Sequence, residues 1–336
     1  MSSRAENRAA VALIGGGRIG RIHAANAAAH PALSLRYVID PIGDAAATLA
    51  ARYGATAATL EGALADPAVA GVIVASPTDQ HLAHCRQAAA AGKAIFCEKP
   101  VDLSAERARA AAPALDRARL FLGFNRRFDP SFRALRQKLQ AGTIGRLETL
   151  HIISHDPAPP PVSYIKVSGG LFKDMTIHDF DVARWLLAEP VVEVYAMAAC
   201  LVDPAIGAAD DIDTAKVLLR TASGRIALIS NSRRSGYGYD QRIEAFGSGG
   251  SVRVDNTTAN TVSVWGEAGA NGAPFQNFFL ERYAEAYRLE MDHFAAVLRG
   301  EKPAVGFLDG VHALELAEAA GHSYTTGRPV ALSGGA

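Results

Sequence analysis

Residues 11–20 read VALIGGGRIG, an apolar run that breaks into a glycine-rich turn and continues into a predicted helix at 19–29. Gly15, Gly17 and Gly20 have the GxGxxG spacing that follows the first strand of dinucleotide-binding domains. In that motif the first glycine allows a tight turn, the second lets the backbone approach a pyrophosphate, and the third lets the helix pack closely on the strand. The helix N-terminus then offers its free N–H groups to the phosphates. The stretch predicts a dinucleotide-binding turn, with a glycine turn of an unrelated α/β domain as the alternative.

An acidic residue, Asp40, ends the next predicted strand at 35–39 and lies 20 residues beyond Gly20. A carboxylate at this position accepts hydrogen bonds from the ribose 2′-hydroxyl of NAD and repels the 2′-phosphate of NADP. The residues that follow are Pro41 and Ile42, and neither can bind a 2′-phosphate as an arginine would. NAD is therefore the predicted cofactor. The alternative is that Asp40 only forms a turn before Pro41.

The pattern of elements changes near residue 124. Before it, predicted helices alternate with nearly apolar predicted strands, among them 69–75, 93–97 and 120–123, as in a parallel sheet covered on both faces. After it, six strands are predicted with few helices, chiefly 171–187 and 278–299; the strands are 147–154, 191–201, 214–221, 225–230, 242–246 and 261–265. The predicted fold class is α/β. A Rossmann NAD-binding domain spans 1–123, and an α+β domain for substrate binding and oligomerisation, with a large, open, mostly antiparallel sheet, spans 124–336. The pattern of the last helix, 308–324, allows it to pack on either domain.

Composition excludes several classes of protein. The 336 residues contain 34 Lys plus Arg and 34 Asp plus Glu, which gives no reason to expect nucleic acid or an anionic membrane as a partner. Cys85, Cys97 and Cys200 form no CxxC pair, which argues against a disulfide framework and a structural zinc site. No apolar stretch reaches the roughly 18 residues of a membrane span, and no signal peptide is predicted. We expect a cytoplasmic protein.

A lysine follows the predicted strand at 93–97, within Glu98-Lys99-Pro100. Ligands of open α/β sheets bind at the carboxyl ends of the strands, so Lys99 is placed to hydrogen-bond a reacting hydroxyl. The alternative is a solvated loop lysine.

Asp174 and His178 lie four residues apart at the start of the predicted helix 171–187, and therefore on one helical face. His178 is a candidate to take a hydroxyl proton, with Asp174 orienting it or binding substrate. Two other interpretations stay open. Asp174 could cap the helix beside a partly buried His178, or these two residues and Asp181 could bind a metal ion.

The order of these motifs resembles that of the glucose-fructose oxidoreductase/inositol dehydrogenase (Gfo/Idh/MocA) family. The resemblance extends through the whole chain, from the glycine turn through Ser76-Pro77-Thr78 and Glu98-Lys99-Pro100 to Asp174 and His178. Residues 123–130, 164–166, 169–181 and 230–240 look most like the inositol dehydrogenases of that family.

The resemblance implies an NAD-dependent dehydrogenase that oxidises a secondary alcohol of a polyol, with myo-inositol as the leading substrate and 2-keto-myo-inositol as the product. It implies a catalytic trio of Lys99, Asp174 and His178, in which His178 is the base, and no metal. It also implies a homotetramer that associates through the open sheet. The alternatives are scyllo-inositol or another sugar as substrate, or a non-catalytic NAD-binding regulator.

The site residues that follow from the motifs and the resemblance form two further sets. The cofactor-binding set is Gly15, Gly17, Arg18, Ile19, Gly20, Asp40, Ser76, Pro77, Thr78, His81, Glu98 and Lys99. The substrate-binding set is Asn125, Arg126, His155, Tyr239 and Tyr287.

Overall fold

The computed structural model describes residues 8–267 and 269–332, and the chain divides into two compact units. Unit 1 consists of residues 1–128 and 286–312, and unit 2 of residues 129–285 and 313–336. The first division lies five residues beyond the boundary expected from the sequence, at 123/124. Residues 286–312, expected in the second domain, belong to unit 1.

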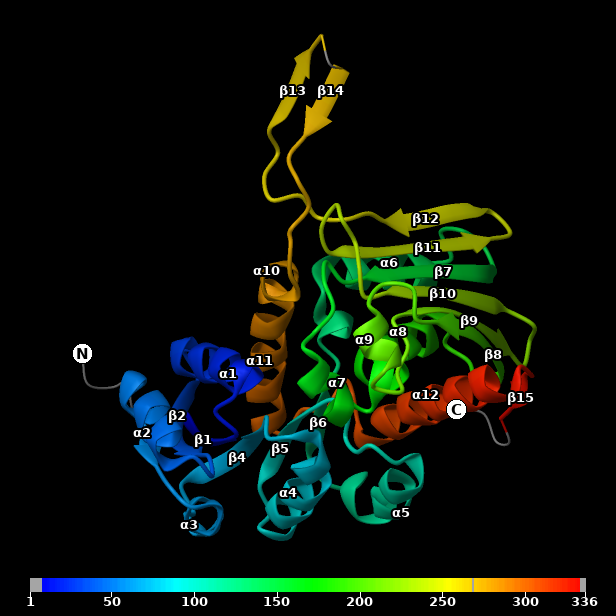
Figure 1. Ribbon diagram of the computed structural model, residues 1–336. Coiled ribbons are helices and arrows are strands. Elements are labelled where there is room, and N and C mark those ends of the chain that lie inside the picture. The colour runs from blue at the N-terminus through cyan, green and yellow to red at the C-terminus, as the bar shows by residue number, and fades with distance from the viewer. Residues whose placement is uncertain (1–7, 268, 333–336) are drawn as a thin grey trace. The chain divides into compact units, whose positions relative to one another are not determined.

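Unit 1 is built on a six-stranded sheet in which every neighbouring pair is parallel (Figure 1). The strand order is β3-β2-β1-β4-β5-β6. The strands are β1 (Ala9–Ile14), β2 (Leu33–Ile39), β3 (Thr56–Ala57), β4 (Val69–Val74), β5 (Ala94–Glu98) and β6 (Leu120–Gly123). The chain order reverses between β1 and β4, and ligands of such sheets bind beyond the strand ends at that point. The predicted Rossmann fold is confirmed.

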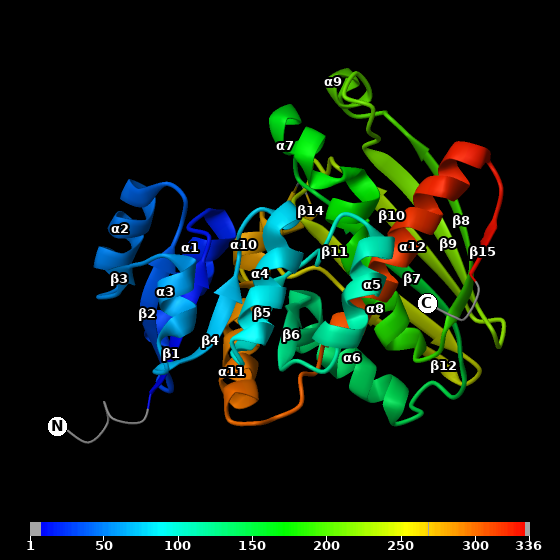
Figure 2. The same cartoon turned by 90° about the horizontal axis from the view of Figure 1, so that it is seen from below.

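Helices cover both faces of this sheet. They are α1 (Arg18–Ala29), α2 (Gly43–Arg52), α3 (Leu60–Ala65), α4 (Thr78–Ala90), α5 (Ala105–Leu115) and α11 (Ala284–Leu298). The ring of Phe96 on β5 contacts His23 of α1, at 4.7 Å between centroids, and Phe294 of α11, at 5.7 Å. These two helices therefore share one face, and α4 and α5 lie on the other (Figures 1 and 2). The first face is the one that matters for the candidate site.

Unit 2 contains a seven-stranded sheet of order β12-β11-β7-β10-β9-β8-β15. Its strands are β7 (Leu147–His155), β8 (Val191–Ala199), β9 (Thr214–Thr221), β10 (Ile226–Ser232), β11 (Asp240–Gly247), β12 (Gly250–Val254) and β15 (Val330–Ala331). Within the described part of the chain, β7 and β10 are parallel and the other neighbouring pairs are antiparallel. This confirms the mostly antiparallel sheet expected from the sequence.

Helices pack on one face of this sheet and leave residues of the other face exposed. The helices and turns of unit 2 are α6 (Pro130–Gln140), α7 (Val162–Ser168), the π-helical turn η2 (Phe172–Thr176), α8 (Ile177–Leu187), α9 (Pro204–Gly207), α10 (Phe279–Arg282) and most of α12 (Phe307–Thr326). Along β9, Ala215, Val217 and Leu219 are buried, whereas the alternate residues are exposed. Such alternation is expected where only one face of a sheet is covered.

Three sequence-based expectations for unit 2 were wrong in detail. The strand expected at 261–265 is not part of the large sheet: within the described residues, β13 (Ser263–Gly266) pairs with β14 (Gly269–Gly272) in a separate two-stranded sheet. Its valines are exposed, so its apolar pattern did not signal burial. The helix expected at 171–187 begins with the π-helical turn η2. The helix expected at 278–299 is interrupted at Tyr283, between α10 and α11. None of the described helices is long and apolar enough to cross a membrane.

Candidate active site

The three glycines of the turn after β1 differ in how closely other atoms approach them. Gly15 has φ +97°, and a Cβ there would lie 2.5 Å from the carbonyl oxygen of Ala75. A Cβ on Gly20 would lie 1.9 Å from the carbonyl oxygen of Gly15, so only glycine allows this approach of helix to strand. Around Gly17, no atom of the described residues would lie within 4 Å of an added Cβ. That open space is what a pyrophosphate needs next to the backbone.

The Asp40 carboxylate is held beside this turn. Its Oδ2 accepts the Gly16 N–H at 2.7 Å, and its Oδ1 accepts the Ile42 N–H at 2.8 Å. Each carboxylate oxygen can accept a second hydrogen bond, so the group can still bind a ribose hydroxyl. Helix α1 begins at Arg18 with no acidic residue in its first turn and no side-chain cap on its N-terminus. These features fit a dinucleotide, with the phosphates at the N-terminus of α1.

His81 of α4 connects the two loops that follow β4 and β5. Its Nδ1 lies 2.8 Å from the carbonyl oxygen of Pro100, and its Nε2 lies 2.8 Å from that of Ser76. Burial, the largest influence, lowers the pKa of His81 despite these two carbonyls. The role of this side chain visible in the structure is to hold together loops that were predicted to bind the cofactor.

Lys99 comes directly after β5 and is half-buried. The preceding residue, Glu98, is 8% exposed, and its Oε1 lies 2.6 Å from Nε2 of His23 on α1. The sequence prediction placed Glu98 at the cofactor, and the structure shows its carboxylate engaged by a buried histidine. His23 was missed from the sequence, although it stands three residues after Gly20 in the helix that the glycine turn begins.

The predicted substrate-binding residues of unit 1 are buried. Asn125 and Arg126 lie in a 3-10 turn, η1 (Asn125–Phe128), and each is 3% exposed. Within the described residues, Oδ1 of Asn125 has no hydrogen-bond partner and is a candidate acceptor for a ligand hydroxyl. Tyr287 of α11 stands edge-on to His23, at 6.0 Å between centroids.

Asp174 and His178 lie in unit 2, on either side of the junction between η2 and α8. The sequence argument assumed a regular α-helix, but Asp174 is in a π-helical turn, a feature often found at functional sites. The Asp174 carboxylate accepts the Tyr164 hydroxyl at 2.9 Å and two N–H groups of Arg233 at 3.3 Å. Arg233 is 1% exposed, so a buried cation orients the predicted acid.

A buried polar network fixes the start of α8 on the sheet. Asp179 is fully buried and accepts the Ser154 hydroxyl of β7 at 2.6 Å and the Asn231 amide of β10 at 2.7 Å. Asn231 in turn accepts the Thr176 hydroxyl at 2.8 Å. Thr176 and Asp179 lie on either side of His178 in the chain, and the sequence did not predict the role of this network. Asn231 and Arg233 are two residues apart at the end of β10. Because alternate residues of a strand point to the same face of a sheet, this spacing was the signal that could have grouped them.

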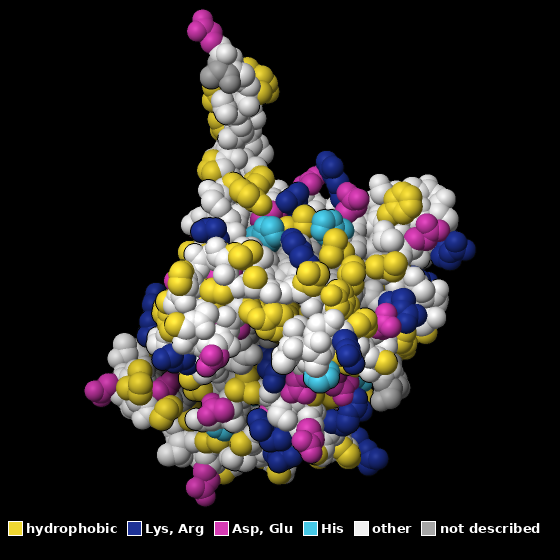
Figure 3. All heavy atoms as spheres, turned by 45° about the vertical axis from the view of Figure 1, so that its right-hand side comes forward, with side chains coloured by type: hydrophobic (Ala, Val, Ile, Leu, Met, Phe, Trp, Pro, Cys, Tyr) yellow, Lys and Arg dark blue, Asp and Glu magenta, His cyan; other side chains and the backbone are white. Residues whose placement is uncertain are grey.

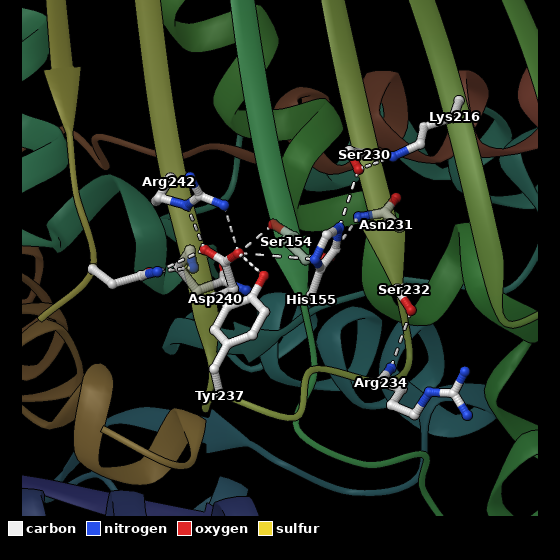
Figure 4. A network of polar contacts seen from close by, with 12 residues as sticks. Ser154, His155, Lys216, Ser230, Asn231, Ser232, Arg234, Tyr237, Asp240 and Arg242 are labelled. Carbon is white, nitrogen blue, oxygen red and sulfur yellow. Dashed lines mark hydrogen bonds and ion pairs between the residues drawn. The ribbon is translucent and has the colours of Figure 1, made fainter. Parts of the chain in front are cut away.

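His155 and Tyr239 occupy a different part of unit 2. Since Ser154 faces α8, its strand neighbour His155 leaves the sheet on the opposite face, where Nε2 lies 3.1 Å from Oγ of Ser230 (Figure 4). Burial lowers the pKa of His155 more strongly than the nearby Asp240 raises it. Tyr239 is 7% exposed, and its ring stands edge-on to Tyr283 at 6.0 Å. Their predicted substrate contacts stay predictions.

Asp240 is the centre of the network in Figure 4. It is fully buried and accepts hydrogen bonds from Arg242 at 2.7 and 2.8 Å, from Tyr237 at 2.6 Å and from Asn256 at 2.7 Å. Burial alone would raise the pKa of this carboxyl, but these donors outweigh burial and lower it. The network stabilises the start of β11.

The positions of the side chains do not support the alternative interpretation of Asp174, His178 and Asp181 as a metal site. Among residues 8–267 and 269–332, no three His, Cys, Asp or Glu side chains are grouped so as to hold a metal ion. The site described above is made of hydrogen-bonding and ionisable groups.

Comparison with known proteins defines the class. Residues 9–125 match the oxidoreductase family with an NAD-binding Rossmann fold, and residues 132–253 match the GFO/IDH/MocA C-terminal domain. The chain is thus an NAD-dependent oxidoreductase. It belongs to the GFO/IDH/MocA family, as the order of its motifs indicated.

Individual relatives are similar over nearly their full length. The chain is 46% identical to an inositol 2-dehydrogenase of Rhizobium meliloti, over 96% of this chain and 98% of that protein. A crystal structure of a myo-inositol dehydrogenase from Corynebacterium glutamicum superposes with a TM-score of 0.93 at 43% identity, covering 97% and 99% of the two chains. The scyllo-inositol dehydrogenase of Lactobacillus casei, solved with NAD(H) and scyllo-inositol, gives 0.88 at 27% identity, covering 96% and 99%.

The glycine turn leads to a prediction with a built-in contrast. Because a Cβ fits at Gly17, Gly17→Ala should change the free energy of unfolding by no more than about 1 kcal/mol. It should nevertheless weaken NAD binding at least about tenfold, since the methyl group occupies the space of the pyrophosphate. Gly20→Ala should lower both stability and affinity, because its Cβ collides with backbone. Urea unfolding and NAD titration calorimetry measure both quantities. Undiminished NAD affinity in Gly17→Ala would contradict the assignment.

Proposed function

We propose that this protein oxidises a secondary hydroxyl of inositol to the ketone, most simply myo-inositol to 2-keto-myo-inositol, with NAD as the oxidant. The observation that carries the proposal is the 46% identity, over nearly the whole of both chains, to an inositol 2-dehydrogenase. The geometry supports it, because the carboxylate of Asp174, four residues before His178, is oriented by Arg233 and Tyr164.

The chemistry divides between proton and hydride. NAD, when bound along the glycine turn and Asp40, supplies the carbon that accepts the hydride. His178 removes the hydroxyl proton as general base, and Lys99 hydrogen-bonds the reacting oxygen and stabilises its developing negative charge. Asp174 holds His178 or a neighbouring substrate hydroxyl. In this assignment Arg233 acts only through Asp174.

The alternatives concern the substrate and the existence of catalysis. The solved relative with bound scyllo-inositol favours a second inositol isomer, or another sugar, as a competing substrate. A cofactor-binding regulator without activity is the other alternative, and the retained Lys99, Asp174 and His178 argue against it.

Steady-state kinetics over inositol isomers and sugars, with NAD and with NADP, tests the proposal directly. The reaction is monitored by the absorbance of NADH or NADPH. We expect the highest kcat/KM with an inositol as substrate and NAD as cofactor, since Asp40 disfavours the 2′-phosphate of NADP. A sugar with a higher kcat/KM than every inositol would contradict inositol as the substrate. Bound NAD with no turnover of any polyol would support the regulator.

The base assignment leads to a separate prediction. His178→Ala should lower kcat by about 10²- to 10⁴-fold and leave the Kd for NAD nearly unchanged, since the variant lacks only the proton acceptor. A histidine base must be neutral to act, so the parent activity should fall as the pH falls and the base becomes protonated, whereas the variant should lose this dependence. His322→Ala, at an exposed histidine, is the control. Parent-like kcat and an unchanged pH profile in His178→Ala would remove His178 from the mechanism.

A homotetramer that associates through the open face of the seven-stranded sheet is part of the proposal. The residues that face away from the helices include Tyr195, Met197, Leu218, Ile226 and Phe246, and the last four are between 43% and 63% exposed. An apolar sheet face of this kind usually marks an interface. The hairpin β13–β14 adds exposed Val264 and Trp265, and Figure 3 shows hydrophobic side chains along it.

A cytoplasmic location belongs to the same proposal. Cys85, Cys97 and Cys200 are free thiols, which is usual for proteins of a reducing compartment.

A charge on the open sheet face tests the assembly. Leu218→Asp should lower the molecular mass of the assembly in solution, measured by sedimentation, because each interface would bury an unpaired carboxylate. Leu201→Asp, at a loop residue that is 68% exposed, is the matched control. The same mass for parent and Leu218→Asp would exclude this face.

A further inference from the structure

Three ionisable side chains are buried on the sheet face of unit 1 that α1 and α11 cover, and one of them, Glu98, directly precedes the predicted catalytic lysine. His23 comes from α1, Glu98 from the end of β5 and Glu290 from α11, and they are 0%, 8% and 0% exposed. Two of them are bonded to each other, since Nε2 of His23 lies 2.6 Å from Oε1 of Glu98. The proposed function assigns no role to His23 or to Glu290.

Aromatic rings close this pocket. His23 stands edge-on to Phe96, at 4.7 Å, and to Tyr287, at 6.0 Å. Phe96 also contacts Phe294, at 5.7 Å. Tyr287 and Phe294 stand three residues before and four residues after Glu290 on α11, so the three share one helical face. Glu290 is therefore directed at the side of the pocket where His23 and Glu98 meet.

Glu290 is an unusual residue to bury. Neither of its carboxyl oxygens has a hydrogen-bond partner in the described part of the chain. An ionised carboxylate in such a place is very costly unless it is paired, whereas a neutral carboxylic acid costs much less. Burial, and secondly the negative charge of Glu98, raise the pKa of Glu290 well above its ordinary value. Burial without a hydrogen-bond partner therefore favours the neutral, protonated form of Glu290.

Nδ1 of His23 is likewise buried, with no hydrogen-bond partner among the residues described. If Nε2 donates to Glu98, Nδ1 of the neutral ring is a bare acceptor. A neutral Glu290 offers one O–H donor, so the two unmatched groups are complementary in kind.

We propose that His23 and Glu290 are positioning residues for Lys99. His23 holds the Glu98 carboxylate by a buried hydrogen bond, and Glu290, as a neutral acid, fills the pocket without adding a second negative charge. Lys99 is the next residue after Glu98, so fixing the Glu98 side chain fixes the backbone from which the lysine reaches the reacting oxygen. This inference rests on the proposed function for the role of Lys99, whereas the protonation of Glu290 does not depend on any activity.

The charged group that acts on Glu290 is the Glu98 carboxylate from β5. Glu98 contacts His23 from α1, and His23 in turn stands edge-on to Tyr287, which lies one turn before Glu290 on α11. Because the pKa of Glu290 is raised in the folded state, the native protein binds a proton that the unfolded chain releases above about pH 4.5. The free energy of unfolding that this proton contributes is therefore lost as the pH rises from about 4.5 through the raised pKa of folded Glu290. Ionised Glu290 would also repel Glu98 and disturb its bond to His23.

The first experiment compares the parent with Glu290→Gln, which is a neutral isostere with no proton to lose. The unfolding equilibrium constant of the parent, relative to that of the variant, should rise by up to about tenfold per pH unit over this range and then level off. The ratio of kcat at pH 9 to kcat at pH 7 should be higher in the variant than in the parent. A stability difference that does not change with pH would show that Glu290 is ionised or exposed, and would overturn this half of the proposal.

The second experiment replaces the donor with an apolar ring, His23→Phe, in the full chain. We expect kcat to fall at least about tenfold while the Kd for NAD changes by less than about threefold, because the glycine turn is untouched. His23→Gln keeps a side-chain N–H donor and should restore part of kcat. Parent-like kcat in His23→Phe overturns the positioning role. Equal loss of kcat and NAD affinity in both variants also overturns it, because that pattern indicates only damaged packing.

The two proposals fail in distinguishable ways. If no polyol is turned over by the parent, the proposed function fails, but the pH dependence of unfolding in Glu290→Gln is still decisive for the protonated acid. If the parent turns over inositol and the His23 variants match it, the function stands and the positioning role is excluded.

Discussion

The carboxylate of Asp179 is the constraint on which the functional part of unit 2 depends. It is completely removed from water, and it is stable there because Ser154 and Asn231 donate hydrogen bonds to it from two adjacent strands. A buried charge with such partners tolerates little displacement, because losing one partner leaves the full cost of desolvation. The first turn of α8 is therefore tied to the parallel pair β7–β10. The backbone position of His178, one residue earlier, follows from that attachment.

The candidate site uses buried charges in two contrasting ways. Asp174 is matched by Arg233, a guanidinium that is almost entirely buried and approaches with two N–H groups. In unit 1, Glu98 is matched by His23, but Glu290 has no partner among the described residues and must keep its proton. A protonated acid keeps its place in the pocket only while it holds the proton, so this part of unit 1 is sensitive to a rise in pH.

Much of the fold could be read from local patterns. The glycine turn and Asp40 were found because a phosphate-binding turn requires particular residue types within a short stretch of chain, and Gly15, Gly20 and Asp40 show the expected geometry. The change from alternating helices and strands to a run of strands predicted a transition near residue 124, and the first division between the compact units follows residue 128. Strands were predicted correctly where their apolar residues are buried. The strand expected at 261–265 was misassigned because its valines are exposed to water.

Contacts between distant residues were out of reach. Arg233 pairs with a carboxylate 59 positions away, and Glu290 lies close enough to Glu98 to feel its charge although most of unit 2 separates them in the chain. Alternation places a side chain on a face, but it does not say which helix covers that face. The π-helical turn at Asp174 was also invisible, because spacing alone does not distinguish it from an α-helix. The roles of Lys99, Asp174 and His178 stay predictions for the same reason.

The division of the chain has a consequence for its biosynthesis. Helix α11, which covers Phe96 beside α1, is encoded after almost all of unit 2. A ribosome that has released the first 128 residues has therefore made the six strands of unit 1 without the helix that shields one side of them. Exposed apolar surface of this kind makes a nascent chain prone to aggregate. The Rossmann half of this protein, although its translation begins first, is completed only after most of unit 2 has been made, so a gene fragment that stops at the first boundary encodes an unfinished domain.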